Sequence, residues 1–352
     1  MKTKTKKPPK SSTRRRAATK SSKASAACSA LRGKFDVMAV GDICVDFIMT
    51  GNVRPQFHQV EQIVGDCALE LGGSATIFAS QLGKLGARVG VIGWTGRDLF
   101  GQFVVEQLRG AGVETARMKV HPTLKTGIGV ALSEENDRAI LTYMGTIDST
   151  SPADITADLL HNCRHWHVAS YFLLSQMRPF WPGWLAKCKQ RGLTTSLDTN
   201  WDPDNRWEGV VDLLPHIDVF FPNENEALAI SGKKDVTEAG RELAKQGPLV
   251  VIKRGERGAL AFKDSRTWEL QPTETTGLPR RIVDGTGAGD NFDAGFLRSW
   301  LFGRDIEACL RWGHRCAVGS LEHQGGTRGQ LLERAARPRT NSRLRLLRTG
   351  DR

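Results

Sequence analysis

The feature that most constrains the fold of this chain is an alternation of short apolar runs with amphipathic segments. Residues 35–41 and 87–93 are apolar runs that end at glycine, and residues 74–86 between them space their apolar side chains like a helix. The alternation returns later, with expected strands at 165–171, 193–197, 219–221 and 249–253 and expected helices at 99–110, 181–191 and 224–230. Strands that alternate with helices form βαβ units. The sequence therefore predicts an α/β fold with a mainly parallel central sheet flanked by helices.

Two stretches, at about 47–64 and 126–143, interrupt this alternation because they read as strand and hairpin without a helix. In the second stretch, a polar turn at 133–137 separates two apolar runs. We expect these segments to form a small β-sheet that acts as a lid. Exposed strands at the edge of such a sheet can pair between chains, which is compatible with a homodimer.

The net charge of +12 comes from the two ends of the chain. Residues 1–34 contain 12 basic residues and no acid, residues 333–352 contain seven arginines and two acids, and the body between them carries about −5. The first segment has almost nothing apolar to bury. We therefore expect a disordered basic tail at 1–34, one folded domain at 35–332 and a second basic tail at 333–352.

Three functions fit the basic N-terminal segment: a solubilising tail, an organellar transit peptide, or an arm that contacts nucleic acid or an acidic surface. No apolar segment follows the basic start, and no apolar run approaches the roughly 18 residues that span a bilayer. The seven cysteines have no regular spacing, which favours a reducing compartment. We expect a cytoplasmic protein without membrane contact, or a plastid or mitochondrial one if the segment is a transit peptide.

The most informative segment for chemistry is residues 282–297, where a strand end runs into a glycine-rich turn and then a helix. Gly285, Gly287 and Gly289 allow close approach of the backbone to a ligand, and the helix start offers free N–H groups to a phosphate. A dinucleotide-binding turn and an ordinary strand-to-helix turn are alternatives, although the glycine spacing is not G-x-G-x-x-G. Asp290, at the helix start, suits either a helix cap or a base that takes a proton from a hydroxyl.

Other segments carry glycines and acids in a recognisable order, namely GDICVD at 41–46, LGGSA at 71–75, PNENE at 222–226, VVIKRGERGA at 250–259 and DGTGAGD at 284–290. Together these segments resemble the motifs of the PfkB-type carbohydrate kinases of the ribokinase-like superfamily, and the resemblance spans residues 35–332. It implies a ribokinase-like fold and a phosphotransferase that uses ATP and Mg²⁺. It also implies Mg²⁺ held through ATP and water, without direct protein ligands, and it allows a monovalent cation near Asp284.

The resemblance also implies roles for individual residues. Asp290 would be the general base, with the amides of Gly287, Ala288 and Gly289 as an anion hole. The substrate would be held by Asp46, Gly72 and Gly73, and the nucleotide and Mg²⁺ would be organised by Asn223, Glu226 and Gly255. The implied reaction is transfer of the ATP γ-phosphoryl group to a hydroxyl of a sugar or small polyol. An adenosine-like nucleoside kinase and a non-catalytic kinase-fold protein with nucleic-acid-binding tails are the alternatives.

Three positions depart from the family pattern. Ile77 stands four residues after the second glycine of the Gly-Gly loop, where the family usually has an Asn that contacts the substrate. Gly285 replaces a small polar residue, and Lys253 replaces a hydroxyl residue. Because a site built for hydroxyls discriminates by paired hydrogen bonds, we expect these changes to alter the choice of substrate.

Two further groups of polar residues admit more than one interpretation. Cys163, His165 and His167 share one face of an expected strand, with His161 nearby, but a metal site would need ligands from elsewhere. Ser170 and Tyr171, and likewise Asp198 and Asn200, follow expected strands, and ligands of open α/β sheets bind at such strand ends. The second pair could instead form a simple turn.

Overall fold

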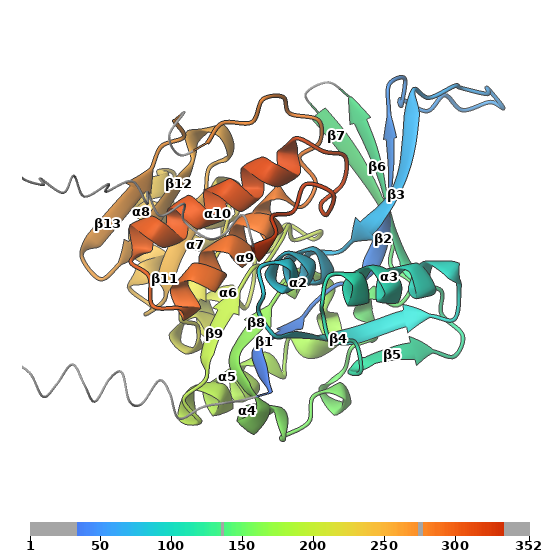
Figure 1. Cartoon of the computed structure of the whole chain (residues 1–352). Helices are drawn as coiled ribbons and strands as arrows, with labels where there is room; N and C mark the ends of the chain where they lie inside the picture. Colours follow the sequence, from blue (N-terminus) through green and yellow to red (C-terminus); the bar gives the residue numbers. More distant parts are fainter. Residues whose placement is uncertain (1–33, 135–136, 274–276, 334–352) are drawn as a thin grey trace, which may run out of the picture.

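The computed structural model describes residues 34–134, 137–273 and 277–333, so most of both basic tails lies outside the described residues. Within these residues, the central sheet has the order β13-β12-β11-β10-β9-β8-β1-β4-β5 (Figure 1). Its strands are β1 (Phe35–Val40), β4 (Val89–Gly96), β5 (Met118–His121), β8 (Cys163–Val168), β9 (Thr194–Leu197), β10 (Val219–Phe220), β11 (Leu249–Lys253), β12 (Ala259–Lys263) and β13 (Arg266–Leu270). The strands from β11 to β5 pair in parallel, whereas β12 and β13 pair antiparallel at one edge. The predicted α/β fold with a mainly parallel sheet is confirmed.

Helices cover both faces of this sheet, and β1 shows why. Met38 and Val40 belong to one buried apolar cluster and Val37 and Ala39 to another, because alternate side chains of a strand point to opposite faces. The first cluster is covered by α5 (Trp181–Gln190), α7 (Glu224–Ser231) and α8 (Val236–Ala244). The opposite face is covered by α2 (Ser74–Lys84), α3 (Leu99–Gly110), α9 (Ala288–Leu301) and α10 (Ile306–Leu321).

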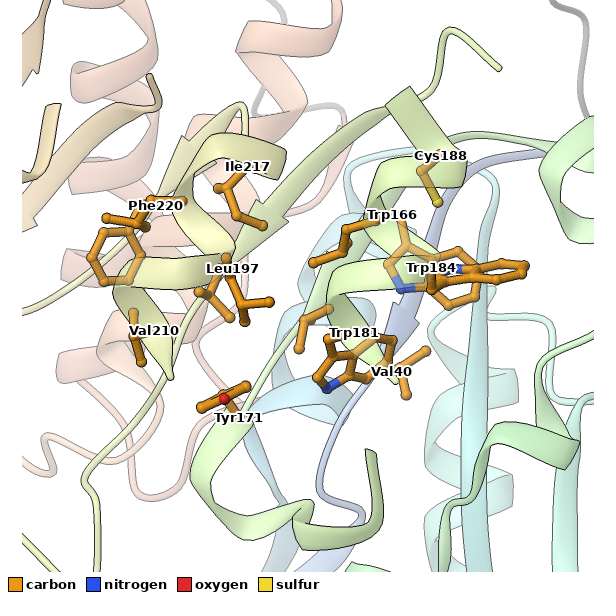
Figure 2. Close-up of a cluster of buried hydrophobic side chains, with 14 of the residues drawn as sticks. Val40, Trp166, Tyr171, Trp181, Trp184, Cys188, Leu197, Val210, Ile217 and Phe220 are labelled. Atoms are coloured by element: carbon orange, nitrogen blue, oxygen red, sulfur yellow. The ribbon is translucent and has the colours of Figure 1, made fainter. Parts of the chain in front are cut away.

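The first cluster contains the bulkiest side chains of the core (Figure 2). Trp166 on β8 and Trp184 on α5 pack edge to face with ring centroids 5.1 Å apart, and Trp181 is fully buried beside them. Such aromatic contacts add packing energy to a large buried area. This cluster makes a rigid base for the loops that follow β8 and β9.

A second, smaller sheet projects from one end of the body (Figure 1). Its order is β3-β2-β6-β7, formed by β2 (Cys44–Thr50), β3 (Asp66–Gly72), β6 (Gly127–Glu134) and β7 (Asp137–Tyr143). The expected hairpin at 126–143 is present. The expectation of a strand segment at 47–64 was wrong in its bounds, because β2 ends at Thr50 and the rest of that segment connects β2 to β3. The connection closes where the Gly65 N–H donates to the Thr50 carbonyl at 2.7 Å.

Other bounds also differ from the expected ones. β8 ends at Val168 rather than Tyr171, because Ser170 has a left-handed backbone with φ of 52° and turns the chain out of the sheet. The antiparallel pair β12–β13 and the helices α8 and α10 were not foreseen. In the described part of the chain, no helix has the length and apolar character needed to cross a membrane.

Candidate active site

The glycine-rich turn leads directly into α9, as expected. Gly287 is the N-cap of this helix with φ of 70°, a conformation that favours glycine. A side chain at Gly287 would also lie 2.9 Å from Gly326 Cα and 3.0 Å from Ile77. Ala288 and Gly289 are the first helical residues, and the first amides of a helix have no partner within it. The turn therefore presents N–H groups at the positive end of the helix dipole.

Asp290 lies in the first turn of α9 and is buried. Burial, with the nearby charge of Asp198, raises the pKa of this carboxyl to about 8, against the opposing effects of Lys253 and a hydrogen bond from Ser74. A carboxyl with such a pKa is mostly protonated at neutral pH, and its ionised form is a stronger base than an ordinary carboxylate.

Lys253, at the end of β11, joins three elements of the site. Its ammonium nitrogen lies 2.6 Å from Asp198 Oδ2, at the end of β9, and 3.1 Å from Asp293 Oδ2, on α9. Although burial disfavours the charged form of Asp198, Lys253 and hydrogen bonds hold its pKa at about 2. Burial raises the pKa of Asp293 well above its usual range, and the charge of Asp198 acts in the same direction. Lys253 thus contacts two buried carboxyl groups, one after β9 and one on α9.

A cluster of polar side chains lies where β1, β8 and β9 end, which is the edge at which parallel sheets bind their ligands. Asp42 is buried and accepts a hydrogen bond of 2.7 Å from the Ser170 hydroxyl. The amide of Asn200 donates to Ser170 Oγ at 2.6 Å and to Ser74 Oγ at 2.5 Å. Burial raises the pKa of Asp42. Ser170 and Asn200 are therefore brought together, whereas the Tyr171 ring is buried in the core beneath them.

Asp46 comes from the small sheet rather than from the body. It lies on β2 directly opposite Gly129 of β6. Its carboxylate occupies the space that a side chain at Gly72, the last residue of β3, would need. Beyond the effect of burial, the charges of Asp46, Asp42 and Asp290 all raise the pKa of the Cys44 thiol. The fold thus brings Asp46 and Asp290 to the same region although they are far apart in the sequence.

Asn223 and Glu226 cap α7 reciprocally. Asn223 Oδ1 accepts from the Glu226 N–H at 2.9 Å, and Glu226 Oε2 accepts from the Asn223 N–H at 2.8 Å. Burial, together with the charge of Asp198, raises the pKa of Glu226 to about 7. The pair therefore stabilises the start of α7, next to the cluster of carboxyl side chains around Lys253.

A cavity of about 300 Å³ opens beside the first turn of α9. Its lining is mostly apolar and comes from the β11–β12 turn, the segment before α9, and α9 and α10, with Lys253, Gly255, Ala288, Gly289, Phe292 and His314 among the residues. Gly255 has φ of 58° and open space where a side chain would lie. A mostly apolar cavity that ends at Lys253 and the first residues of α9 is suited to a ligand with an apolar ring and a charged group.

The histidines and Asp284 have partners within the protein. His165 Nε2 and His167 Nδ1 each lie 2.7 Å from the Ser196 hydroxyl, and His167 stacks on Phe78 with centroids 3.8 Å apart. Among the residues that the structure describes, no group of three His, Cys, Asp or Glu side chains could hold a metal ion. Asp284 accepts hydrogen bonds from the Thr286 N–H and hydroxyl and from the Gly325 N–H at 2.8 to 2.9 Å.

Sequence reasoning missed Asp42, Asn291 and Asp293. Asp42 directly follows an expected strand, which is the signal that singled out Ser170 and Asp198, so it could have been found in the same way. Asp293 lies one helical turn after Asp290, and only 1% of its surface is exposed. Asn291 gave no signal, because two of its three partners, Gly326 and Gln330, lie 35 and 39 residues further along the chain.

The large, mainly parallel sheet with helices on both faces and the small projecting sheet together form a ribokinase-like fold. The chain belongs to the pfkB family of carbohydrate kinases, because the sequence model of that family matches residues 34–332.

Relatives of the chain include enzymes for different acceptors. It is 28% identical to the cytidine kinase of Thermococcus kodakarensis over 72% of this chain and 88% of that protein. It is 27% identical to the ribokinase of Bacillus subtilis over 85% of this chain and 98% of that protein. Among solved structures, a candidate ribokinase II from E. coli in complex with ATP and Mg²⁺ has a TM-score of 0.74 at 23% identity, covering 86% of this chain and 97% of that one.

Proposed function

We propose that the protein transfers the γ-phosphoryl group of ATP to a hydroxyl of a sugar or related small polyol. The observation that carries this proposal is the position of Asp290, a buried carboxyl with a pKa of about 8, at a helix start whose amides border the cavity. A base at this point can accept the proton of a hydroxyl while the amides bind the transferred group.

The two sides of the site have different roles in this reaction. The cavity beside α9 would hold the adenine and ribose, with the phosphates directed to Gly287, Ala288 and Gly289 and to the Lys253 ammonium, which lies 3.3 Å from the side-chain position of Gly289. The acceptor would lie on the other side of Asp290, against Asp42 and Asp46 and the backbone of Gly72 and Gly73. Phosphoryl transfer depends mainly on this kind of positioning and charge stabilisation.

Mg²⁺ fits the site as a companion of the nucleotide. Among the carboxyl groups near Lys253, Asp198 has the lowered pKa, but it is already paired with the ammonium. Asn223 and Glu226 would therefore hold the ion through water, and when bound it would neutralise phosphate charge. A monovalent cation near Asp284 would add to a carboxylate that already accepts three hydrogen bonds.

A nucleoside acceptor is the second candidate. The cytidine kinase relative favours it, and so does Trp201, which follows Asn200 and keeps 52% of its surface exposed although its ring packs edge to face on Trp207. Stacking on an exposed indole is a common way to bind a base. A third reading, a non-catalytic protein that binds nucleic acid through its tails, predicts ATP binding without transfer.

A substrate screen separates these functions. Purified full-length protein is incubated with Mg²⁺, ATP and single acceptors from sets of pentoses, hexoses, sugar acids and nucleosides, and ADP formation is measured. A sugar that increases turnover at least 100-fold over ATP alone supports the first proposal, and a nucleoside that does so supports the second. No stimulation by any acceptor, together with salt-dependent RNA or DNA retention that is lost when residues 1–34 are removed, supports the third.

A further inference from the structure

We propose that Asn291 is a positioning residue whose side-chain amide holds the anion-binding turn. This inference rests on the proposed role of the turn in binding phosphate. Asn291 is fully buried on α9, directly after Asp290. Its side-chain amide is hydrogen-bonded to other parts of the protein.

The amide of Asn291 ties together two turns from distant parts of the chain. Its nitrogen donates to the Gly287 carbonyl and to the Gly326 carbonyl, both at 2.8 Å. Its oxygen accepts from the amide nitrogen of Gln330 at 2.9 Å. Each polar atom of the side chain therefore has a partner, which makes the connection specific in direction.

Gln330 extends the connection to α2. Its amide nitrogen also donates to the Ile77 carbonyl at 3.0 Å, and its oxygen accepts from the Ser80 hydroxyl at 2.7 Å. Gln330 and Ser80 are both buried. The network thus fixes the first turn of α9 relative to the helix that follows the Gly-Gly loop.

Holding the Gly287 carbonyl sets the direction of the next amide. In a trans peptide unit the C=O and N–H point in opposite directions, so a carbonyl tied to Asn291 turns the Ala288 N–H toward the start of the helix. That N–H has only a long contact of 3.4 Å with the Gly285 carbonyl. A phosphate oxygen can therefore take it over at small cost.

Ile77 contacts the same two glycines. Its Cδ1 atom lies 2.7 Å from the side-chain position of Gly326 and 3.0 Å from that of Gly287. An asparagine at position 77 would place its amide beside these glycines as well. An amide introduced at position 77 would therefore be close enough to substitute for that of Asn291, which in this chain supplies the hydrogen bonds from α9.

The test compares Asn291→Ala, the double variant Ile77→Asn/Asn291→Ala and the control Ser299→Ala, which changes a buried hydroxyl two turns further along α9. Affinities for Mg²⁺-ATP and Mg²⁺-ADP are measured by calorimetry without an acceptor, and folding by thermal melting. We expect Asn291→Ala to weaken ATP binding by about 10-fold and ADP binding by less than 3-fold. The double variant should bind ATP at most about 3-fold more weakly than the wild type, which is half of the loss on a logarithmic scale. Ser299→Ala should bind both nucleotides like the wild type.

Several results would overturn the inference. These are ATP affinity of Asn291→Ala within 2-fold of the wild type, equal losses for ATP and ADP, or a double variant no better than the single one. If Asn291→Ala does not fold, Gln330→Met removes the donor to Asn291 and should weaken ATP binding by about 3-fold, whereas unchanged ATP binding contradicts the inference. Because these measurements need no acceptor, a wild type that binds ATP but transfers nothing refutes the proposed function and leaves the test of Asn291 intact.

Discussion

The ammonium of Lys253 lies 2.6 Å from a carboxylate oxygen of Asp198, and both side chains are largely withdrawn from solvent. This contact joins the ends of β9 and β11, and the second contact of Lys253, with Asp293, adds α9. The ammonium is therefore desolvated before any ligand arrives. A phosphate at the start of α9 would meet a cation whose hydration has already been removed.

Replacement of Lys253 by methionine should destabilise the protein. It leaves the charged Asp198 buried without its partner, which typically costs about 3 kcal/mol or more. We expect a lower melting temperature and a weaker affinity for Mg²⁺-ATP, measured by scanning calorimetry and titration calorimetry. Lys245→Met is the matched control, since Lys245 pairs with Glu242 in an exposed i,i+3 contact. Equal melting temperatures for the two variants would contradict a structural role of the Lys253 pair.

Replacement of Asp290 by asparagine should lower kcat by roughly 100-fold or more, on the usual magnitude of general base catalysis. The same change should stabilise the fold at pH 8. Because the pKa is about 8 in the folded protein and 3.8 without its environment, the folded state binds more protons between these values, and wild-type stability falls as pH rises through this range.

Melting temperatures at pH 5, 6.5 and 8 test this second effect. The difference between Asp290→Asn and the wild type should grow with pH, whereas the exposed substitution Asp264→Asn should show no such trend. A variant with near-normal turnover would rule out Asp290 as the base.

The pH dependence of the wild-type reaction provides a separate test. If Asp290 must lose its proton to act, log kcat/KM should rise with a slope of about one below pH 8 and level off above, since this parameter reports the free enzyme. The rate is measured from pH 6 to 9.5 with the acceptor found by the screen. A flat profile over that range is incompatible with a pKa of about 8 at the base.

His167 should make the fold sensitive to acid. Burial lowers its pKa to about 3 from 6.5, so between these values the unfolded chain binds the extra proton and stability falls as pH decreases. One such group changes the free energy of unfolding by up to about 1.4 kcal/mol per pH unit.

The substitution His167→Gln should therefore reduce the loss of stability between pH 7 and 5, measured by urea unfolding at both values. The control is His58→Asn on the exposed connection between β2 and β3. If His167→Gln loses as much stability in acid as the wild type, another group is responsible.

The sequence predicted best what depends on local pattern. The bounds of α3 and the start of α9 at the glycine-rich turn are as expected, because amphipathic spacing and glycine position are visible in a short window. The β12–β13 pair was missed because both strands have only five residues, and β13, at the sheet edge, buries only its last residue.

The site was predictable in its motif residues but not in its contacts. Lys253 appeared only as a departure from a family pattern, because its partners Asp198 and Asp293 lie 55 and 40 residues away. Likewise Ile77 was expected to affect the acceptor, and the structure places its side chain against Gly287 and Gly326. Such contacts depend on how β9, β11, α2 and α9 meet, and no short stretch of sequence contains that information.

Asp42 and Asp46 are separated by only three residues, yet one lies at the end of a strand of the large sheet and the other on β2 of the small sheet. An acceptor held by both carboxylates would span the junction of the two sheets. A bound acceptor would then fix the orientation of the two sheets relative to each other. An acceptor too short to reach both carboxylates would not restrict that orientation. The distance between the two carboxylates, each fixed to a different sheet, would therefore select acceptors by their length.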